Sequence, residues 1–244
     1  MLAGLYTSAA GMEAQQAHLD ALANDLANVD TTGYKSLRVD FHDLLYQAAG
    51  MGGGPGVETG SGAAAGVFGR NFTEGALQQT EQPLDVALIG PGFIRVQDAQ
   101  GNEELTRDGS LQVDAEGRLC TSSGQLLQPE VKIPDGVDPS EVSISSNGTV
   151  SAGGKRLGQI SIVTVNNPDG LQPVGESLFR PTEASGATRA AEGTTVQQGA
   201  LESSNVDVGD ATVEMMNAQR GFQLASKAIQ TEDEVLAVAN GVKR

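Results

Sequence analysis

The sequence predicts an α+β protein with an N-terminal and a C-terminal helix that form a coiled coil, and with a central antiparallel all-β domain between them in sequence. Two apolar ladders with heptad spacing, one at each end of the chain, predict the helices. Short β-prone runs between Gly-containing turns predict the β domain. The presence of 32 Gly and no Trp among 244 residues agrees with a turn-rich centre.

The N-terminal ladder predicts a first helix from about Leu2 to Asn28. Its apolar residues recur every seven positions and are Leu5, Met12, Leu19 and Leu26. Turn residues ending at Gly33 stop the helix. A seam this narrow favours a partner helix as its cover, and a helix lying on an ordinary globular core is the alternative.

The segment after this helix is expected to hold a short amphipathic helical piece and then a linker. Four apolar residues suggest helical spacing, namely Leu37, Phe41, Leu44 and Leu45. The stretch 50–69 consists mostly of Gly, Ala and Ser, a composition typical of an adaptable linker. Within it, Val67 and Phe68 are able to pack, so the stretch is either only a tether or an interface that packs between subunits through these two residues.

Short β-prone runs dominate residues 84–196. They are Val86–Ile89, Gly92–Val96, Ser110–Val113, Arg118–Cys120, Val142–Ile144 and Ile160–Val165. Short turns that contain Gly separate several of these runs. Such turns predict hairpins and an antiparallel sheet.

The C-terminal ladder predicts a second long helix. Its apolar residues are Val208, Met215, Phe222, Ile229 and Leu236. A second set follows three positions after each, and it comprises Ala211, Ala218, Ala225, Glu232 and Ala239. The small Ala side chains let helix axes approach closely, while polar members such as Glu232 weaken an isolated pair. We therefore expect both ladders to serve as an assembly interface.

These elements divide the chain into four expected segments. They are an N-terminal helix at 1–35, an extended Gly-rich linker segment at 36–83, an all-β domain at 84–198 and a C-terminal helix at 199–244.

Charge and hydropathy exclude two classes of partner. The formal charge of −16 and the pI near 4.4 argue against nucleic acid, because phosphate binding needs a basic surface. No run reaches the roughly 18 apolar residues of a membrane span. Residues 1–11 also lack the features of a cleavable secretory signal.

Few residues indicate chemistry, so we expect no cofactor and no metal. His18 and His42 lack a second ligand at metal spacing, and Cys120, between Leu119 and Thr121 in a predicted strand, is interpreted as a small core residue. The pair Glu103 and Asp114 leaves open a cell-wall glycosidase with helical extensions, since glycoside hydrolysis uses two carboxyl groups. With 31 acidic residues such a pair arises by chance, and no aromatic sugar platform accompanies it, so an enzyme is not expected.

Two signature segments resemble those of bacterial flagellar basal-body rod and hook proteins. The first is residues 23–35, ANDLANVDTTGYK, and the second combines GALESSNVD at 199–207 with AQRGF at 218–222. Three central segments also resemble the family, at 106–111, 167–171 and 178–182. Residues 14–16 and 41–47 look most like the distal-rod branch, whereas Asp25 stands where the family usually has Asn. A proximal rod protein is the alternative within the family.

The resemblance implies a structural subunit. Such proteins are exported unfolded through the flagellar type III apparatus and polymerise, with other rod and hook proteins as neighbours, into a helical tube outside the cytoplasmic membrane that transmits torque from motor to hook. Contacts that do not close on themselves produce such an open assembly. Short polar residues and one Gly are expected as turn formers or helix caps, namely Asn24, Asn28, Gly33, Asn205 and Asp207.

Overall fold

The computed structural model describes residues 2–44, 47–49, 57–59, 62–134 and 136–241, and it divides into two compact units. Unit 1 comprises residues 1–27, 37–69 and 207–244, and unit 2 comprises residues 28–36 and 70–206. The fold is α+β, with mostly antiparallel sheets and one helix near each end of the chain.

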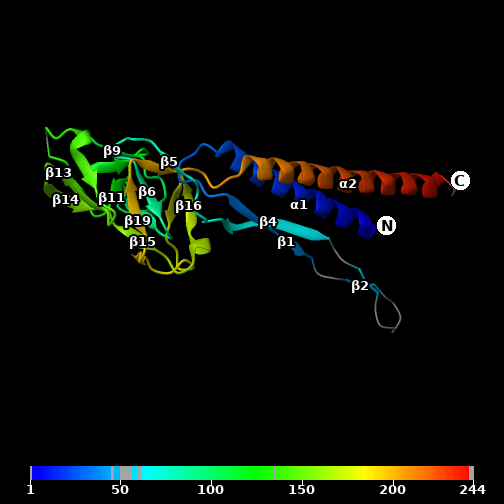
Figure 1. Cartoon of the computed structure of the whole chain (residues 1–244). Coiled ribbons are helices and arrows are strands. Elements are labelled where there is room, and N and C mark those ends of the chain that lie inside the picture. The colour runs from blue at the N-terminus through cyan, green and yellow to red at the C-terminus, as the bar shows by residue number, and fades with distance from the viewer. Residues whose placement is uncertain (1, 45–46, 50–56, 60–61, 135, 242–244) are drawn as a thin grey trace. The chain divides into compact units, whose positions relative to one another are not determined.

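Unit 1 is built on two long helices that run antiparallel. Helix α1 spans Leu2–Ala27 and helix α2 spans Val208–Gly241. The two helices lie side by side with both chain ends at the same end of the pair (Figure 1). Gly4 lies against Glu232 and Gly221 lies against Gln15, so positions rise along α1 as they fall along α2.

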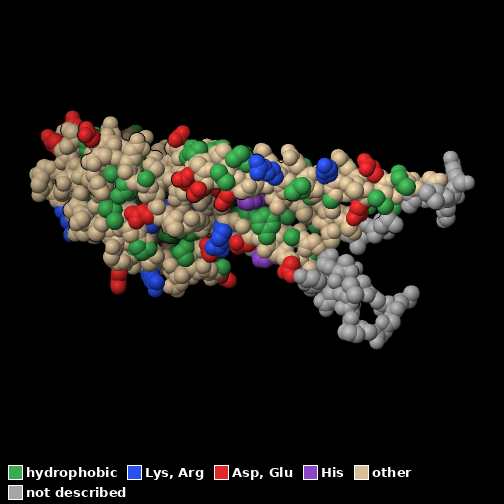
Figure 2. All heavy atoms as spheres, turned by 45° about the vertical axis from the view of Figure 1, so that its right-hand side comes forward, with side chains coloured by type: hydrophobic (Ala, Val, Ile, Leu, Met, Phe, Trp, Pro, Cys, Tyr) green, Lys and Arg blue, Asp and Glu red, His purple; other side chains and the backbone are tan. Residues whose placement is uncertain are grey.

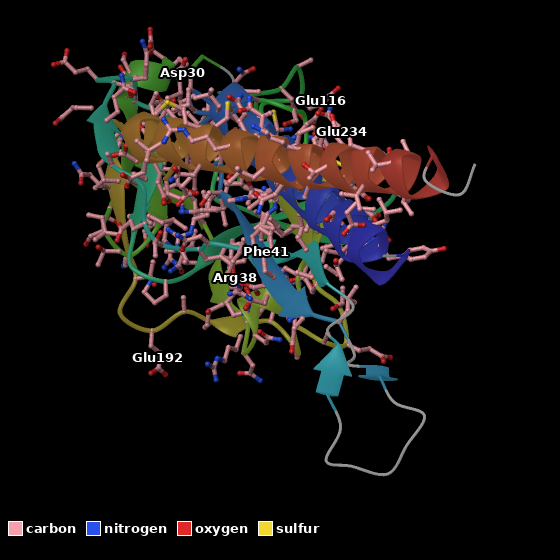
Figure 3. The ribbon with its side chains drawn as sticks, turned by 90° about the vertical axis from the view of Figure 1, so that its right-hand side faces the viewer. Asp30, Arg38, Phe41, Glu116, Glu192 and Glu234 are labelled. Atoms are coloured by element: carbon pink, nitrogen blue, oxygen red, sulfur yellow. The ribbon has the colours of Figure 1, made fainter. Side chains whose placement is uncertain are left out.

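Short strands complete unit 1. Strand β1, Leu37–Asp43, pairs with β4, Ala63–Arg70, and β2, Gln47–Ala49, pairs antiparallel with β3, Val57–Thr59. Figure 3 shows Arg38 and Phe41 on β1 and Glu234 on α2. The rings of Phe41 and His18 meet edge to face with centroids 5.5 Å apart, so β1 packs on α1.

The helical piece expected at residues 37–45 is wrong, because residues 37–43 form strand β1. The carboxylate of Asp25 accepts the backbone N–H of Leu37 at 3.0 Å, and the following residues pair with β4. Alternating Leu37, Val39 and Phe41 suit an extended backbone as well as they suit a helix. Leu45, with residues 50–56 and 60–61 of the expected linker, lies outside the described residues.

Unit 2 contains a nine-stranded sheet. Seven strands follow the order β16-β17-β8-β7-β11-β10-β9, and β15 pairs with both β7 and β18. Their bounds are β7 Phe93–Gln97, β8 Glu103–Thr106, β9 Leu111–Val113, β10 Leu119–Thr121, β11 Leu126–Leu127, β15 Ile162–Thr164, β16 Gln172–Gly175, β17 Leu178–Arg180 and β18 Arg189–Ala190.

Smaller sheets complete unit 2, and each of their pairings is antiparallel. The three-stranded sheet is β12 Val142–Ile144, β13 Thr149–Ala152 and β14 Lys155–Gln159. The two-stranded sheets are β6 Val86–Ile89 with β19 Thr195–Gln198, and β5 Leu77–Gln79 with β20 Ala200–Glu202. Two short 3₁₀ turns lie at Pro139–Glu141 and Pro168–Gly170.

Two apolar clusters form the core of unit 2. The larger joins β6, β7 and the three-stranded sheet, and it includes fully buried Ile94, Leu119 and Val150. The smaller surrounds Phe93 and Phe179, against which Phe72 packs. The free thiol of Cys120 is buried, and this burial raises its pKa.

The C-terminal helix begins at Val208, where the apolar ladder begins, and not at the start of the expected C-terminal segment. The segment expected as helix started at residue 199, but Ala200–Glu202 pair with β5 and the helix begins at Val208. The Oδ1 atom of Asp207 accepts the backbone N–H of Asp210 at 3.0 Å, which caps the first turn. None of the described helices is long and apolar enough to cross a membrane.

Candidate functional site

The facing surfaces of α1 and α2 are made of small and half-buried side chains. On α2, Ala211 is 7% exposed and Ala218 is 2% exposed, and both are buried. A Cβ on Gly4 would lie 1.9 Å from a carboxylate oxygen of Glu232, so the helices approach closely there. Small residues at the contact permit short distances between the helix axes.

The predicted ladder residues lie mostly along partly covered faces. Those of intermediate exposure are Leu5, Met12, Leu19, Leu26, Met215, Phe222, Ile229 and Leu236, whereas Val208 is exposed at the start of α2. The buried apolar residues described in α1 are two alanines, Ala14 and Ala21, and one larger residue, Leu22. The helix pair therefore buries its ladders only in part.

Unit 2 contains a buried ionic cluster that the sequence analysis did not single out. The carboxylate of Glu202 accepts hydrogen bonds from Lys35 Nζ at 2.5 Å, from Arg107 at 2.9 Å and from the backbone N–H of Gly75 at 2.9 Å. Both side chains of the Lys35–Glu202 pair are 0% exposed. Burial, partly offset by the hydrogen bond from Lys35 to Glu202, lowers the pKa of Lys35.

The cluster ties together three segments that are far apart in sequence. Lys35 belongs to the first signature segment, Glu202 to the second, and Arg107 to a central segment. Lys35 also donates to the carbonyl of Thr73 at 2.6 Å, and Arg107 donates to the carbonyl of Gly90 at 2.8 Å. Because a buried charge without its partner is costly, the cluster holds these segments in one arrangement.

Asn205 and Gly33 connect the same segments of unit 2 as the ionic cluster does. The Oδ1 atom of Asn205 accepts the backbone N–H of Ser36 at 2.8 Å, and its Nδ2 atom donates to the carbonyl of Asn71 at 2.7 Å. Gly33 has φ +65°, and a Cβ there would lie 2.6 Å from the backbone of Arg107. A side chain at position 33 is therefore excluded by both conformation and space.

The other predicted turn residues occupy simpler positions. Asn28 follows α1 directly, and its Oδ1 atom accepts the Thr31 hydroxyl at 3.2 Å. Asn24 is exposed near the end of α1. Val67 on β4 is 53% exposed, while the side chain of Phe68 lies outside the described part of the structure.

The two carboxylates considered for glycoside hydrolysis each form an ion pair with an arginine. Glu103 pairs with Arg95 at 3.0 Å, and Asp114 pairs with Arg118 at 2.7 Å across a hairpin turn. Among the described residues, no group of three or more His, Cys, Asp or Glu side chains is placed to hold a metal ion.

Sequence reasoning missed the ionic cluster because each member reads as an ordinary surface charge. The only signal available was the position of each charged residue inside a recognisable signature segment. Nothing in a single sequence shows that residues 35, 107 and 202 converge on one buried point.

Known proteins align with this chain over its full length. Three family models match, described as flagella basal body rod protein at residues 5–35, flagellar hook protein FlgE/F/G D1 domain at residues 87–152 and flagellar basal body rod FlgEFG protein C-terminal at residues 197–242. The chain is 38% identical over 264 residues to the flagellar basal-body rod protein FlgG of Borreliella burgdorferi, with all of both chains covered. It is 39% identical over 267 residues to FlgG of Bacillus subtilis and 30% identical over 273 residues to the flagellar hook-basal body complex protein FlhP of the same organism, again with all of both chains covered.

Proposed function

Because the chain belongs to the flagellar basal-body rod protein family and is a structural subunit of the rod, we propose that its copies polymerise into the helical tube of the distal rod. The tube transmits torque from the motor to the hook. Full-length similarity to FlgG proteins favours the distal over the proximal rod. The protein has a mechanical role and no catalytic one.

The observation that carries this proposal is the incomplete burial of unit 1. Large apolar side chains stay exposed on α2, including Leu224 at 70% and Val238 at 67%. Exposed apolar surface of this kind marks an interaction site. Neighbouring copies cover these side chains, and the terminal helices then form a coiled coil in the assembled rod.

The neighbours of this subunit are further copies and other rod and hook proteins. The chain reaches its place outside the cytoplasmic membrane by export through the flagellar apparatus. The ladder residues on both helices, together with Val67 and Phe68, contribute to contacts between subunits. Within unit 2, the hydrogen bonds of Asn205 and the left-handed turn at Gly33 hold the signature segments in one arrangement.

The test introduces a charge into the C-terminal ladder. Phe222→Asp places a carboxylate in a half-buried apolar site, which costs several kcal/mol. We expect a strain carrying this variant to lose swimming and rod assembly. Gln223→Asp, at the exposed neighbouring position, is the control and should swim normally.

Two measurements accompany the swimming assay. Circular dichroism of the purified variant should retain the signal of the β unit, which separates lost assembly from lost folding. Electron microscopy of the concentrated wild-type chain should show filaments or short tubes. Normal swimming with Phe222→Asp contradicts the assembly role of this ladder.

A further inference from the structure

Helix α2 carries a second apolar strip that its own α1 does not cover. The exposed large side chains of this strip are Val213, Met216, Leu224, Val235 and Val238. At 3.6 residues per turn they fall within a strip roughly 120° wide, on the side of α2 opposite Ala211 and Ala218. We call these five residues, with Arg220 and Lys227, the outer strip of α2.

Arg220 and Lys227 place two positive charges on the outer strip of α2, and the exposed Glu234 lies at its edge, about five turns from Met216. Both basic residues are exposed and lie seven positions apart, or two helical turns. Within the described residues, neither forms a salt bridge. Figure 2 shows basic, acidic and apolar side chains along α2.

Helix α1 exposes a strip with the opposite charge. Its members alternate at spacings of three and four positions and are Tyr6, Ala9, Glu13, Gln16, Asp20, Ala23 and Ala27, all exposed. We call them the outer strip of α1. Its two acidic residues, Glu13 and Asp20, are also seven positions apart, and neither forms a salt bridge within the described residues.

We propose that the outer strip of α1 in one copy binds the outer strip of α2 in a second copy of this chain, with Glu13 facing Lys227 and Asp20 facing Arg220. The proposal rests on the proposed function and specifies the partner surface. Equal spacing lets both charge pairs form at once when the helices run antiparallel, as α1 and α2 do within one chain.

The same register pairs the apolar members of the two strips. It places Gln16 at the level of Leu224 and Ala27 at the level of Val213. Tyr6, which is 73% exposed, reaches Val235. Small side chains on α1 meet larger ones on α2, so the helices can approach closely.

The register also requires neighbouring copies to be displaced along the helix axis. Within one chain Gln15 contacts Gly221, which puts Glu13 near the level of Gln223. In the proposed contact Glu13 faces Lys227, four positions further along α2, or about 6 Å at 1.5 Å per residue. For copies whose helix pairs run parallel, each copy is displaced along the axis, and a head-to-tail contact with such a displacement does not close into a ring.

Charge reversal on either strip tests the contact. The acidic variant carries Arg220→Glu with Lys227→Glu, and the basic variant carries Glu13→Lys with Asp20→Lys. In the acidic variant like charges face each other between copies, and the same holds in the basic variant. We expect each variant alone to lose at least tenfold in sedimentable polymer at a concentration where the wild type assembles.

Mixing the two variants is the decisive step. The basic α1 of one then faces the acidic α2 of the other, so an equimolar mixture should restore polymer with alternating copies. The fourfold variant that carries all the changes should also assemble. Glu192→Lys reverses one exposed charge of unit 2, outside both outer strips, serves as the control and should assemble like the wild type.

Disulfide trapping checks the register. Gln16→Cys combined with Leu224→Cys should give a ladder of linked oligomers under oxidation, and Gln16→Cys combined with Val235→Cys should not. A wild type that never polymerises contradicts the proposed function. Two outcomes with a polymerising wild type overturn this contact and leave the proposed function standing. In one, each charge-reversed variant alone forms as much polymer as the wild type. In the other, the mixed variants form no polymer.

Discussion

The two units differ in how completely they bury their apolar side chains. Unit 2 encloses large residues such as Leu105 at 0% and Phe179 at 2% exposed. Unit 1 buries mainly alanines and exposes large residues such as Leu224 at 70%. The stability of unit 2 therefore arises within the chain, whereas unit 1 depends on neighbours for much of its burial.

The largest expected effect concerns protection from proteolysis in the dilute monomer. Trypsin should cleave after Arg220 and Lys227 on α2 at least roughly ten times faster than after Lys35 and Arg107, because local opening is easier where little apolar surface is buried. Mass spectrometry of timed digests measures the fragments. Residues 28–36 should remain with the protected unit. Similar rates at all four sites would contradict the comparison, and polymerisation should protect α2.

The next effect concerns the ionic cluster inside unit 2. Glu202→Gln removes the charge that compensates Lys35 and Arg107, and we expect it to lower the free energy of unfolding by about 3–5 kcal/mol. Urea denaturation followed by alkylation of Cys120 reports the unfolding of this unit, because that thiol is buried.

The control for this variant is Glu116→Gln. Glu116 is 63% exposed beside Arg118, so its loss should cost less than about 1 kcal/mol. Equal urea midpoints for Glu202→Gln and the wild type would show that the cluster does not stabilise unit 2.

The smallest expected effect concerns a hairpin turn of unit 2. The side-chain hydrogen bond from Asn102 holds the pKa of Asp98 below its usual range. A lowered folded pKa means that Asp98 contributes stability above about pH 4, and that this contribution is lost as the pH falls through the folded pKa. Asn102→Ala should raise the pKa of Asp98 toward its ordinary value. An NMR titration of the Asp98 carboxyl that shows no change would remove this explanation.

Local patterns predicted the first helix and one of the strands closely. Heptad spacing predicted the first helix at residues 2–28, and α1 spans Leu2–Ala27. Strand β12 coincides with the predicted run Val142–Ile144. Such features depend on periodicity and turn residues, which are readable in a short window of sequence.

Tertiary structure decided what short windows leave ambiguous. Residues 37–43 form a strand because Asp25 and β4 supply hydrogen bonds, and residues 200–202 form a strand because β5 pairs with them. The cluster of Lys35, Arg107 and Glu202 exists only after distant segments meet. The sequence determined the heptad ladders and the family, but only the tertiary structure showed which face of each helix is covered within the chain and which is left for a neighbour. The physical reason is that burial is set by contacts distant in sequence, which a local period cannot specify.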